Sequence, residues 1–315
     1  MRLITFIRAG SVSAEIGARI PLDSGDRILP FSDAAKLNNI AHFPANMKSF
    51  LGAGDTSMQL AKNWVANFQS NPDLLKFTLD GDAISYLPPI SNADKFLCVG
   101  KNYRSHLEEL KRSNLIKEIP EEPTCFVKLN SCLSAHNAKV VRPKGITHLD
   151  YEPELVFVMG KRALKAKGED ALSYIAGITI LNDLTCRDLQ LREVKSGSRF
   201  WTGKNIPGFG PLGPEIITLD EIPNVYDLWM TCAVNGQVRM RVNTSEQIWK
   251  IADILEHFSR YIPIEAGDLF STGAPGGVAV GKPNAEELYL KPGDVIECSI
   301  EGVATLRSYI ADEVE

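Results

Sequence analysis

The sequence contains no cluster of basic residues and no long apolar run. Its 34 lysines and arginines are scattered among 39 acidic residues, and the formal net charge is -5 at pH 7. Because this pattern offers nothing that could follow a phosphate backbone, we expect no nucleic-acid partner. No stretch approaches the roughly 20 apolar residues of a membrane helix, and the apolar N-terminal stretch ends at Arg8, too early for the core of a signal peptide. We therefore expect a cytoplasmic protein without a membrane partner.

Paired cysteines are also missing from the sequence. The six cysteines are spread through the chain and none forms a C-x-x-C pair, so we expect neither a zinc clasp nor a thioredoxin-type redox pair. Most of them lie in apolar runs such as residues 96–99, and we interpret them as buried free thiols in a reducing compartment. The six are Cys98, Cys125, Cys132, Cys186, Cys232 and Cys298.

What is present is the composition of a soluble globular protein, 44% hydrophobic and 23% charged over 315 residues. We interpret residues 1–90 as a small N-terminal α+β domain that serves packing or dimer support. Residues 1–8 predict an edge strand and residues 11–20 its hairpin partner. Apolar spacing in residues 47–68 predicts two helices, with Asp55 as the N-cap of the second.

Residues 91–315 have a different texture, and the preceding Pro88-Pro89 pair marks a linker. Short β-rich runs alternate with glycine and proline turns, and helices are fewer. This pattern predicts a mixed α/β, β-dominated domain without regular βαβ alternation. The expected strands span residues 96–99, 124–129, 154–159, 177–181, 228–234 and 295–300. The expected helices span residues 102–113, 183–195 and 245–260.

The most informative segment of the chain is residues 149–160. Residues 154–159 are expected to form a buried strand, and side chains two residues apart in a strand point to the same face. Glu152 and Glu154 therefore project side by side, and two such carboxylates repel each other unless a cation or a proton lies between them. Hard cations such as Mg²⁺, Mn²⁺ and Ca²⁺ prefer all-oxygen sites of this kind. The alternative interpretation is a pair of exposed glutamates at the end of a strand.

A second apolar strand, residues 176–182, ends in another carboxylate, Asp183. The residues that follow look helical, so Asp183 is a candidate N-cap that could also ligate a metal. Arg187 and Gln190 come next at helical spacing, so that a carboxylate, a guanidinium and an amide could share one face. This set suits a bound metal with a carboxylate substrate beside it. An ordinary solvated helix face is the alternative for Arg187 and Gln190.

Further motifs accompany these two segments in a fixed order. They are the segment 99–109, the Tyr-Glu-x-Glu-Leu strand at 151–155, the Asn-Asp-Leu-Thr-x-Arg-Asp-x-Gln segment at 182–190, Gly203-Lys204, and the glycine-rich segment 271–278. Together they resemble the fumarylacetoacetate hydrolase family, in its acylpyruvase-like branch, over about residues 94–312. The resemblance implies a mixed β-sandwich roll for the large domain, a homodimer, and a Mg²⁺ or Mn²⁺ site, with Ca²⁺ as a further candidate.

Carried over residue by residue, the resemblance also implies roles for individual side chains. The metal ligands that it implies are Glu152, Glu154 and Asp183. The substrate-binding residues that it implies are Arg187, Gln190, Lys204, Thr272 and Gly273. In this family a Thr-Gly-Thr-Pro motif is usual, and here it reads Thr-Gly-Ala-Pro at 272–275, so one side-chain contact at Ala274 is missing.

His106 and Glu109 are three residues apart and share a helical face. A neutral imidazole beside a carboxylate can activate water, although a surface His-Glu pair is the ordinary interpretation. The resemblance implies a catalytic dyad carried by a lid, which we expect to include residues 110–123. It also implies that Lys128 is a strand lysine that faces the site.

The expected activity is metal-dependent hydrolysis of a C–C bond in a small 2,4-dioxo acid of the acylpyruvate or fumarylpyruvate type. In this hypothesis Glu109 and His106 activate water, and Lys128 or Gln190 stabilises the oxyanion. Decarboxylation of oxaloacetate, or isomerisation or hydration of an unsaturated keto acid, would use the same metal site. A metal-binding scaffold without catalysis is the remaining alternative, and it would need no dyad.

Overall fold

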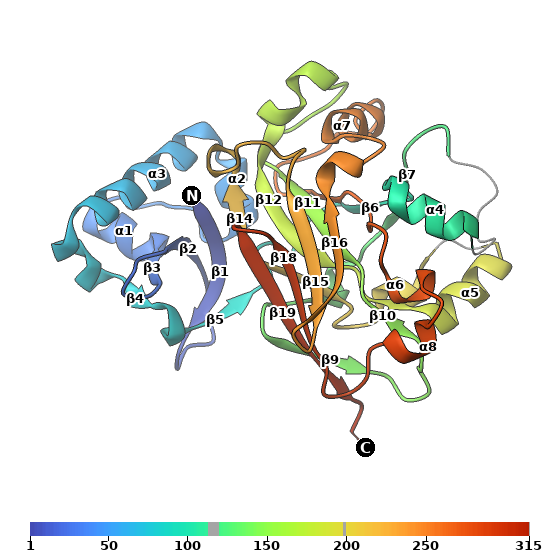
Figure 1. Cartoon of the computed structure of the whole chain (residues 1–315). Coiled ribbons are helices and arrows are strands. Elements are labelled where there is room, and N and C mark those ends of the chain that lie inside the picture. Colours follow the sequence, from blue (N-terminus) through green and yellow to red (C-terminus); the bar gives the residue numbers. More distant parts are fainter. Residues whose placement is uncertain (113–119, 198–199, 315) are drawn as a thin grey trace.

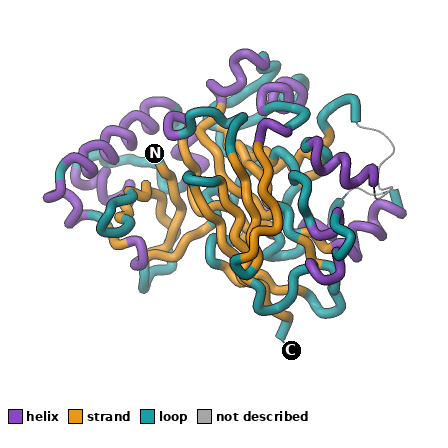
Figure 2. The backbone as a smooth tube through the Cα atoms, viewed as in Figure 1, coloured by secondary structure: helices purple, strands orange, loops and turns teal. Residues whose placement is uncertain are grey.

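The structure, a computed structural model, describes residues 1–112, 120–197 and 200–314. Strands occupy the middle of the molecule and helices lie on both sides (Figure 2). The main path of the large sheet is β4 (Leu79–Asp80), β3 (Arg27–Pro30), β2 (Ala14–Ile20), β1 (Arg2–Arg8), β14 (Gly210–Thr218), β12 (Ile175–Asn182), β11 (Pro153–Met159), β17 (Leu269–Ser271), β6 (Phe96–Gly100) and β7 (Thr124–Val127). Beside this path, β5 (Ile84–Leu87) pairs with β1, and β8 (Leu133–Ser134) pairs with β14.

A second sheet packs against the first. Its order is β16 (Gln237–Asn243), β15 (Trp229–Val234), β18 (Val295–Ile300), β19 (Ala304–Asp312) and β9 (Ala138–Arg142). The main hydrophobic core lies between the two sheets and includes the stacked rings of Phe157 and Phe270, whose centroids are 4.9 Å apart. The expected β-dominated, mixed α/β fold is therefore confirmed, and all six expected strands are present within a few residues of their predicted bounds.

After Glu154, strand β11 is a continuous apolar run, without alternation of polar and apolar residues, because both of its faces are buried. Leu155 and Phe157 face the core between the sheets, whereas Val156 and Val158 face a second core on the other side. Since both faces are covered, every residue of β11 is buried, and a carboxylate on this strand is buried with it.

The N-terminal part forms that second core. Its helices are α1 (Phe31–Leu37), α2 (Met47–Gly52) and α3 (Asp55–Ser70), drawn at the left of Figure 1. The expected hairpin and the two expected helices are confirmed. The prediction of an edge strand was wrong, because β1 pairs with β2, β5 and β14. Asp55 is not the N-cap of α3. Gly54 occupies that position, and the Asp55 carboxylate lies in the first turn and pairs with Lys161 at 3.0 Å. An acid in the first turn still interacts favourably with the helix dipole.

The two parts of the chain share one sheet and one core. Arg2 and Leu3 of β1 pair with Ile217 and Ile216 of β14. Phe50 of α2 belongs to the same hydrophobic cluster as Leu212 of β14. The N-terminal part is thus packed directly on the larger part, and the domain boundary at residue 90 stays a prediction.

The remaining helices are α4 (Arg104–Arg112), α5 (Arg187–Lys195), α6 (Thr202–Asn205), α7 (Ile251–Phe258) and α8 (Ala285–Leu288). Helices α4, α5, α6 and α8 gather on the side of the sheets away from the N-terminal part (Figure 1). None of the helices in the described ranges is long and apolar enough to cross a membrane.

Two expected helices are shorter than predicted. The helix expected at 245–260 is reduced to α7, since residues 244–246 form a separate 3₁₀ turn. The helix expected from Asp183 starts only at Arg187, because residues 185–186 form β13 and pair with β10 (Leu149–Asp150). Asp183 is therefore not a helix N-cap, and that prediction was wrong.

Candidate metal and substrate site

Three buried carboxylates meet where β11 begins and β12 ends. The backbone N–H of Asp183 donates to the carbonyl of Glu152 at 2.8 Å, and Pro153 pairs with Asn182 across the two strands. One oxygen from each of Glu152, Glu154 and Asp183 lies within 4.8 Å of the other two. The structure thus brings together the three residues that the sequence assigns to a metal.

Two buried lysines lie against these carboxylates. The Nζ of Lys204 donates to Glu152 and, at 2.6 Å, to Asp183 Oδ2. The Nζ of Lys128 donates to Asp183 Oδ1 at 2.7 Å, to the carbonyl of Phe209 at 3.0 Å, and to the carbonyl of Lys204. Because an ammonium group has three hydrogens, all donors of Lys128 are engaged within the protein. Lys128 therefore orients Asp183 and has no free donor for a substrate oxyanion.

Arg187 is engaged in the same way. Its guanidinium donates to Asp150 from Nε at 2.9 Å and from Nη2 at 2.7 Å, to Glu152 Oε1 at 2.6 Å, and to Gln190 Oε1 at 2.8 Å. The expected proximity of Arg187 and Gln190 is confirmed. The guanidinium positions the Glu152 carboxylate, and among the described residues the amide hydrogens of Gln190 have no acceptor.

The charges around the triad are not fully matched. Burial would raise the pKa of Glu152, but Lys204 and Arg187 outweigh it and lower this pKa to about 2. Burial and then the Asp183 carboxylate raise the pKa of Glu154 well above its ordinary value. In the described part of the chain Glu154 has no ion-pair partner, and its hydrogen bond comes from the hydroxyl of Ser271. Glu154 is therefore the carboxylate that most requires a proton or a metal ion.

The donor set fits a hard divalent cation. Counting Asp150 with the triad, four buried carboxylates face the three buried cations Lys128, Arg187 and Lys204, which leaves one excess negative charge. Three converging carboxylates without nitrogen or sulfur donors are typical of Mg²⁺ or Mn²⁺ sites, and of Ca²⁺ sites. Glu152, Glu154 and Asp183 would hold the ion.

The glycine-rich segment lies beside the triad. The backbone N–H of Thr272 donates to the Leu155 carbonyl at 2.9 Å and its hydroxyl donates to the same carbonyl at 3.0 Å. Thr272 is thus fixed to β11, and its expected role in substrate binding stays a prediction. Gly273 has a φ of +95°, and a Cβ there would lie 2.7 Å from the Val99 carbonyl, so a side chain at this position would be strained.

The dyad lies on α4, against the same glycine-rich segment. His106 Nδ1 and Glu109 Oε2 are 3.5 Å apart, and each side chain is 12% exposed. Glu109 Oε1 accepts from the backbone of Gly277 at 2.7 Å, which fixes that carboxylate. His106 lies close enough to Glu152 to favour its charged form. Part of the expected lid, residues 113–119, lies outside the described residues.

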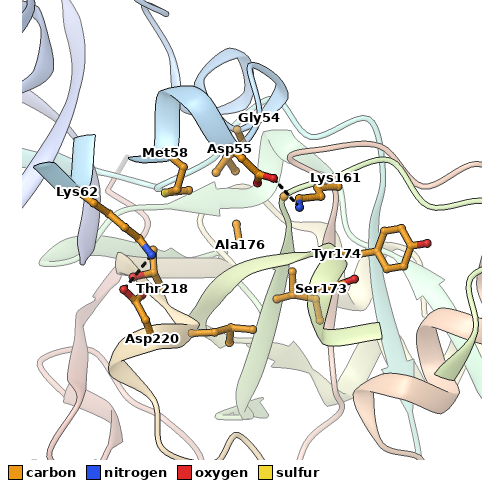
Figure 3. A pocket seen from close by; sticks show the side chains of 14 residues that line it. Gly54, Asp55, Met58, Lys62, Lys161, Ser173, Tyr174, Ala176, Thr218 and Asp220 are labelled. Carbon is orange, nitrogen blue, oxygen red and sulfur yellow. Dashed lines mark hydrogen bonds and ion pairs between the residues drawn. The ribbon is translucent and has the colours of Figure 1, made fainter. Parts of the chain in front are cut away.

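A separate hollow of about 180 Å³ lies between α3 and the large part of the chain. Lys62 pairs with Asp220 at one end and Lys161 with Asp55 at the other, with Met58 between them (Figure 3). No residue of the triad or the dyad lines this hollow. Its charges are paired across the two parts of the chain, so we interpret it as a junction and not as the reaction site.

Sequence reasoning missed one buried carboxylate, Asp150. It accepts hydrogen bonds from Arg187 and from the backbone N–H groups of Tyr151, Ala279 and Val280. It therefore connects the turn that follows the glycine-rich segment with the arginine that orients Glu152. The available signal was a third acid two residues before Glu152, which no motif had assigned.

Comparison with known proteins agrees with this arrangement. Residues 95–311 match the family described as fumarylacetoacetate (FAA) hydrolase C-terminal. The chain belongs to the fumarylacetoacetate hydrolase family. The mitochondrial oxaloacetate tautomerase fahd2 of Xenopus laevis is 32% identical over 307 residues, which cover 97% of this chain and 89% of that protein. The fumarylacetoacetate hydrolase domain-containing protein 2 homolog of Dictyostelium discoideum is 33% identical over 318 residues, with 97% and 96% covered.

A solved structure extends the comparison to the fold. The fumarylacetoacetate hydrolase of Exiguobacterium antarcticum superposes with a TM-score of 0.76 at 28% identity, covering 99% of this chain and all of that one. The expected family and fold are confirmed. The printed names of these relatives include a tautomerase and a hydrolase, so the comparisons support an enzyme of this family without fixing its reaction.

Proposed function

We propose that this protein is a Mg²⁺- or Mn²⁺-dependent enzyme that interconverts the keto and enol forms of a small dicarboxylic 2-oxo acid such as oxaloacetate. One observation carries this proposal. His106 Nδ1 and Glu109 Oε2 are buried beside the carboxylate triad, and in the described part of the chain neither atom has a hydrogen-bond partner. A base and an acid whose facing atoms have no hydrogen-bond partner among the described residues suit proton transfer on a ligand bound at a neighbouring cation site.

The chain supplies both the binding and the proton transfer. In the reaction the C3–H bond breaks, its electron pair forms the C2–C3 double bond, and a proton is added to the oxygen at C2. His106 with Glu109 accepts the C3 proton and delivers a proton to that oxygen. A divalent ion bound by the triad would act as a Lewis acid that stabilises negative charge on the same oxygen. The name of the 32% identical relative, an oxaloacetate tautomerase, supports this choice of substrate.

Hydrolysis of the C–C bond of a 2,4-dioxo acid is the second candidate. It needs an attacking water and a donor for the oxyanion in addition to the dyad. Lys128, one of the two donors that we expected, is fully engaged by Asp183 and two carbonyls. Within the described ranges the amide hydrogens of Gln190 have no acceptor, and this observation keeps hydrolysis as a candidate. Proton transfer asks for fewer groups, which is why we place it first.

The test compares three reactions of two substrates on one Mg²⁺-loaded preparation. Ultraviolet absorbance follows the enol of oxaloacetate, pyruvate formation reports its decarboxylation, and loss of acetylpyruvate reports hydrolysis. We expect enol–keto interconversion to be accelerated without stoichiometric formation of pyruvate. Rapid hydrolysis of acetylpyruvate with no effect on the oxaloacetate enol would reverse the order of the two candidates. The homodimer and the cytoplasmic location stay predictions, open to sedimentation velocity and cell fractionation.

A further inference from the structure

Two basic side chains, those of Lys282 and Arg239, lie close to each other and to Glu109. Lys282 follows the 3₁₀ turn η7 (Ala279–Gly281), and its Nζ donates to the backbone carbonyl of Arg239 in β16 at 2.6 Å. Both side chains are partly buried. In the mechanism proposed above neither residue has a role.

The turn before Lys282 connects these basic residues to the site. A Cβ on Gly281 would lie only 2.7 Å from Glu109 Oε2, so the Glu109 carboxylate packs directly on this turn. The backbone N–H of Val280 donates to Asp150 Oδ2 at 3.1 Å. Lys282 therefore comes one residue after the glycine that packs on Glu109. It comes two residues after the valine that donates to Asp150, the carboxylate that orients Arg187.

The electrostatics of this corner favour an additional anion. Burial, and then the neighbouring Arg239 guanidinium, lower the pKa of Lys282, while Glu109 and Asp150 act in the opposite direction. Asp150 is already paired with Arg187, and of the two carboxylates that act on Lys282 the stronger influence is that of Glu109. In the described ranges the Nε of Arg239 is buried and has no hydrogen-bond acceptor. A buried guanidinium N–H without an acceptor is unfavourable, and an anionic ligand would satisfy it.

We propose that Lys282 and Arg239 bind the second carboxylate of a dicarboxylic 2-oxo acid, at the end of the substrate that lies away from the metal triad. This inference rests on the proposed function for the 2-oxo carboxylate end. In this proposal Lys282 and Arg239 determine which class of substrate is selected. The enzyme prefers a dicarboxylate over an oxo acid of the same length that has an apolar tail. The interpretation that competes with it is purely structural, with Lys282 joining the turn to β16 through the Arg239 carbonyl.

The test uses two ligands that differ only at the distal group. Oxaloacetate and 2-oxobutyrate have four carbons each, and a carboxylate in the first replaces a methyl group in the second. Exchange of the C3 hydrogens with solvent deuterium, followed by proton NMR and corrected for the uncatalysed rate, gives kcat/KM for both. The readout is the ratio of the two values, so a general loss of activity cancels.

We expect Lys282→Gln and Arg239→Gln each to lower this ratio by about tenfold or more, mainly through KM, since a hydrogen bond between charged groups is worth at least that factor. Lys282→Arg should retain the ratio within about threefold, because it keeps the charge. Lys291→Gln, an exposed lysine further along the chain, is the matched control. Thermal unfolding of each variant identifies a folding defect.

An unchanged ratio in both folded glutamine variants would overturn the proposal. A wild-type enzyme that does not prefer the dicarboxylate would do the same. If the protein catalyses no exchange at all, the proposed function fails, and the ratio of the dissociation constants of the two ligands for Mg²⁺-loaded protein replaces the kinetic ratio. Binding of oxalate, which has no distal group, separates these cases because it reports only on the metal end.

Discussion

Replacing Asp150 with Asn tests whether this carboxylate holds the site together. Its Oδ2 accepts from the Arg187 guanidinium twice and from the backbone of Val280, and its Oδ1 accepts from the backbones of Tyr151 and Ala279. Four of these five contacts are buried and the one from Val280 is partly buried, and the Asp150 side chain is 0% exposed. An asparagine has the same shape but only one acceptor oxygen, so its NH₂ group must face donors on one side or the other.

The magnitude follows from the number of donors that lose their acceptor. If the NH₂ group replaces Oδ1, two backbone N–H groups are left unpaired; if it replaces Oδ2, Arg187 loses two bonds and Val280 one. Each buried donor without an acceptor costs about 1–3 kcal/mol. Breaking one side of a buried ion pair costs about 3–5 kcal/mol in other proteins. We therefore expect Asp150→Asn to lower the free energy of unfolding by about 3 kcal/mol.

Urea unfolding of the metal-free protein, followed by circular dichroism and fluorescence, measures this change. Asp312→Asn is the control, because that carboxylate pairs with Arg142 at a position where its side chain is 60% exposed, and the expected cost is about 0–1 kcal/mol. Calorimetry should also show Mg²⁺ binding weakened by about 10- to 100-fold, since Arg187 would no longer be fixed against Glu152. A loss of stability below about 1 kcal/mol with unchanged Mg²⁺ affinity would refute the connecting role of Asp150.

Four further outcomes are expected. The pKa of Glu154 is raised, so Mg²⁺ binding should release up to one proton, and the Mg²⁺ affinity should fall by about tenfold per pH unit below that pKa. Calorimetry in buffers of different ionisation enthalpy measures the proton release, and an affinity that does not change with pH would contradict this prediction. The pKa of Glu152 is lowered from 4.5 to about 2, so its ion pairs stabilise the fold above pH 4.5 and this stability is lost as the pH falls toward 2; acid unfolding of Glu152→Gln should lack that component. His106→Ala should leave Mg²⁺ affinity intact and reduce kcat by about 10²–10⁴-fold, and an enzyme of full activity would remove His106 from the mechanism. Oxalate should bind measurably only after the metal, so equal binding in EDTA would show that the anion site does not depend on the cation.

The sequence predicted the carboxylates because the relevant information is local. Glu152 and Glu154 are two residues apart, and their common face requires only that the extended backbone of β11 include the residue just before it. The prediction of Asp183 at the end of the next apolar strand also needed only the end of β12. The family resemblance then joined the two segments, which no local pattern could have done.

The cations around the carboxylates could not be assigned from local patterns. Lys128 is 55 residues from Asp183, and Lys204 is 52 residues from Glu152. Their side chains lie inside because strand pairing and the turn before β14 bring them there, and neither segment has a periodicity that reveals a partner. The helix expected from Asp183 failed for the same reason, since pairing of β13 with β10 overrides the helical preference of residues 184–186.

The buried lysines explain how a site for a cation can also bind an anion. Lys204 lies between Glu152 and Asp183, where it keeps two like charges together in a buried position that they could not share alone. When Glu154 is ionised, four carboxylates against three cations leave a single negative charge, which favours a divalent ion over a carboxylate ligand. Once a divalent ion is bound, the sum becomes a single positive charge, and the same cluster attracts the carboxylate of an oxo acid. With fewer buried cations the metal-loaded site would stay neutral or negative and would not attract a carboxylate. The two lysines and the arginine therefore set the order of binding, in which the metal ion binds before the substrate.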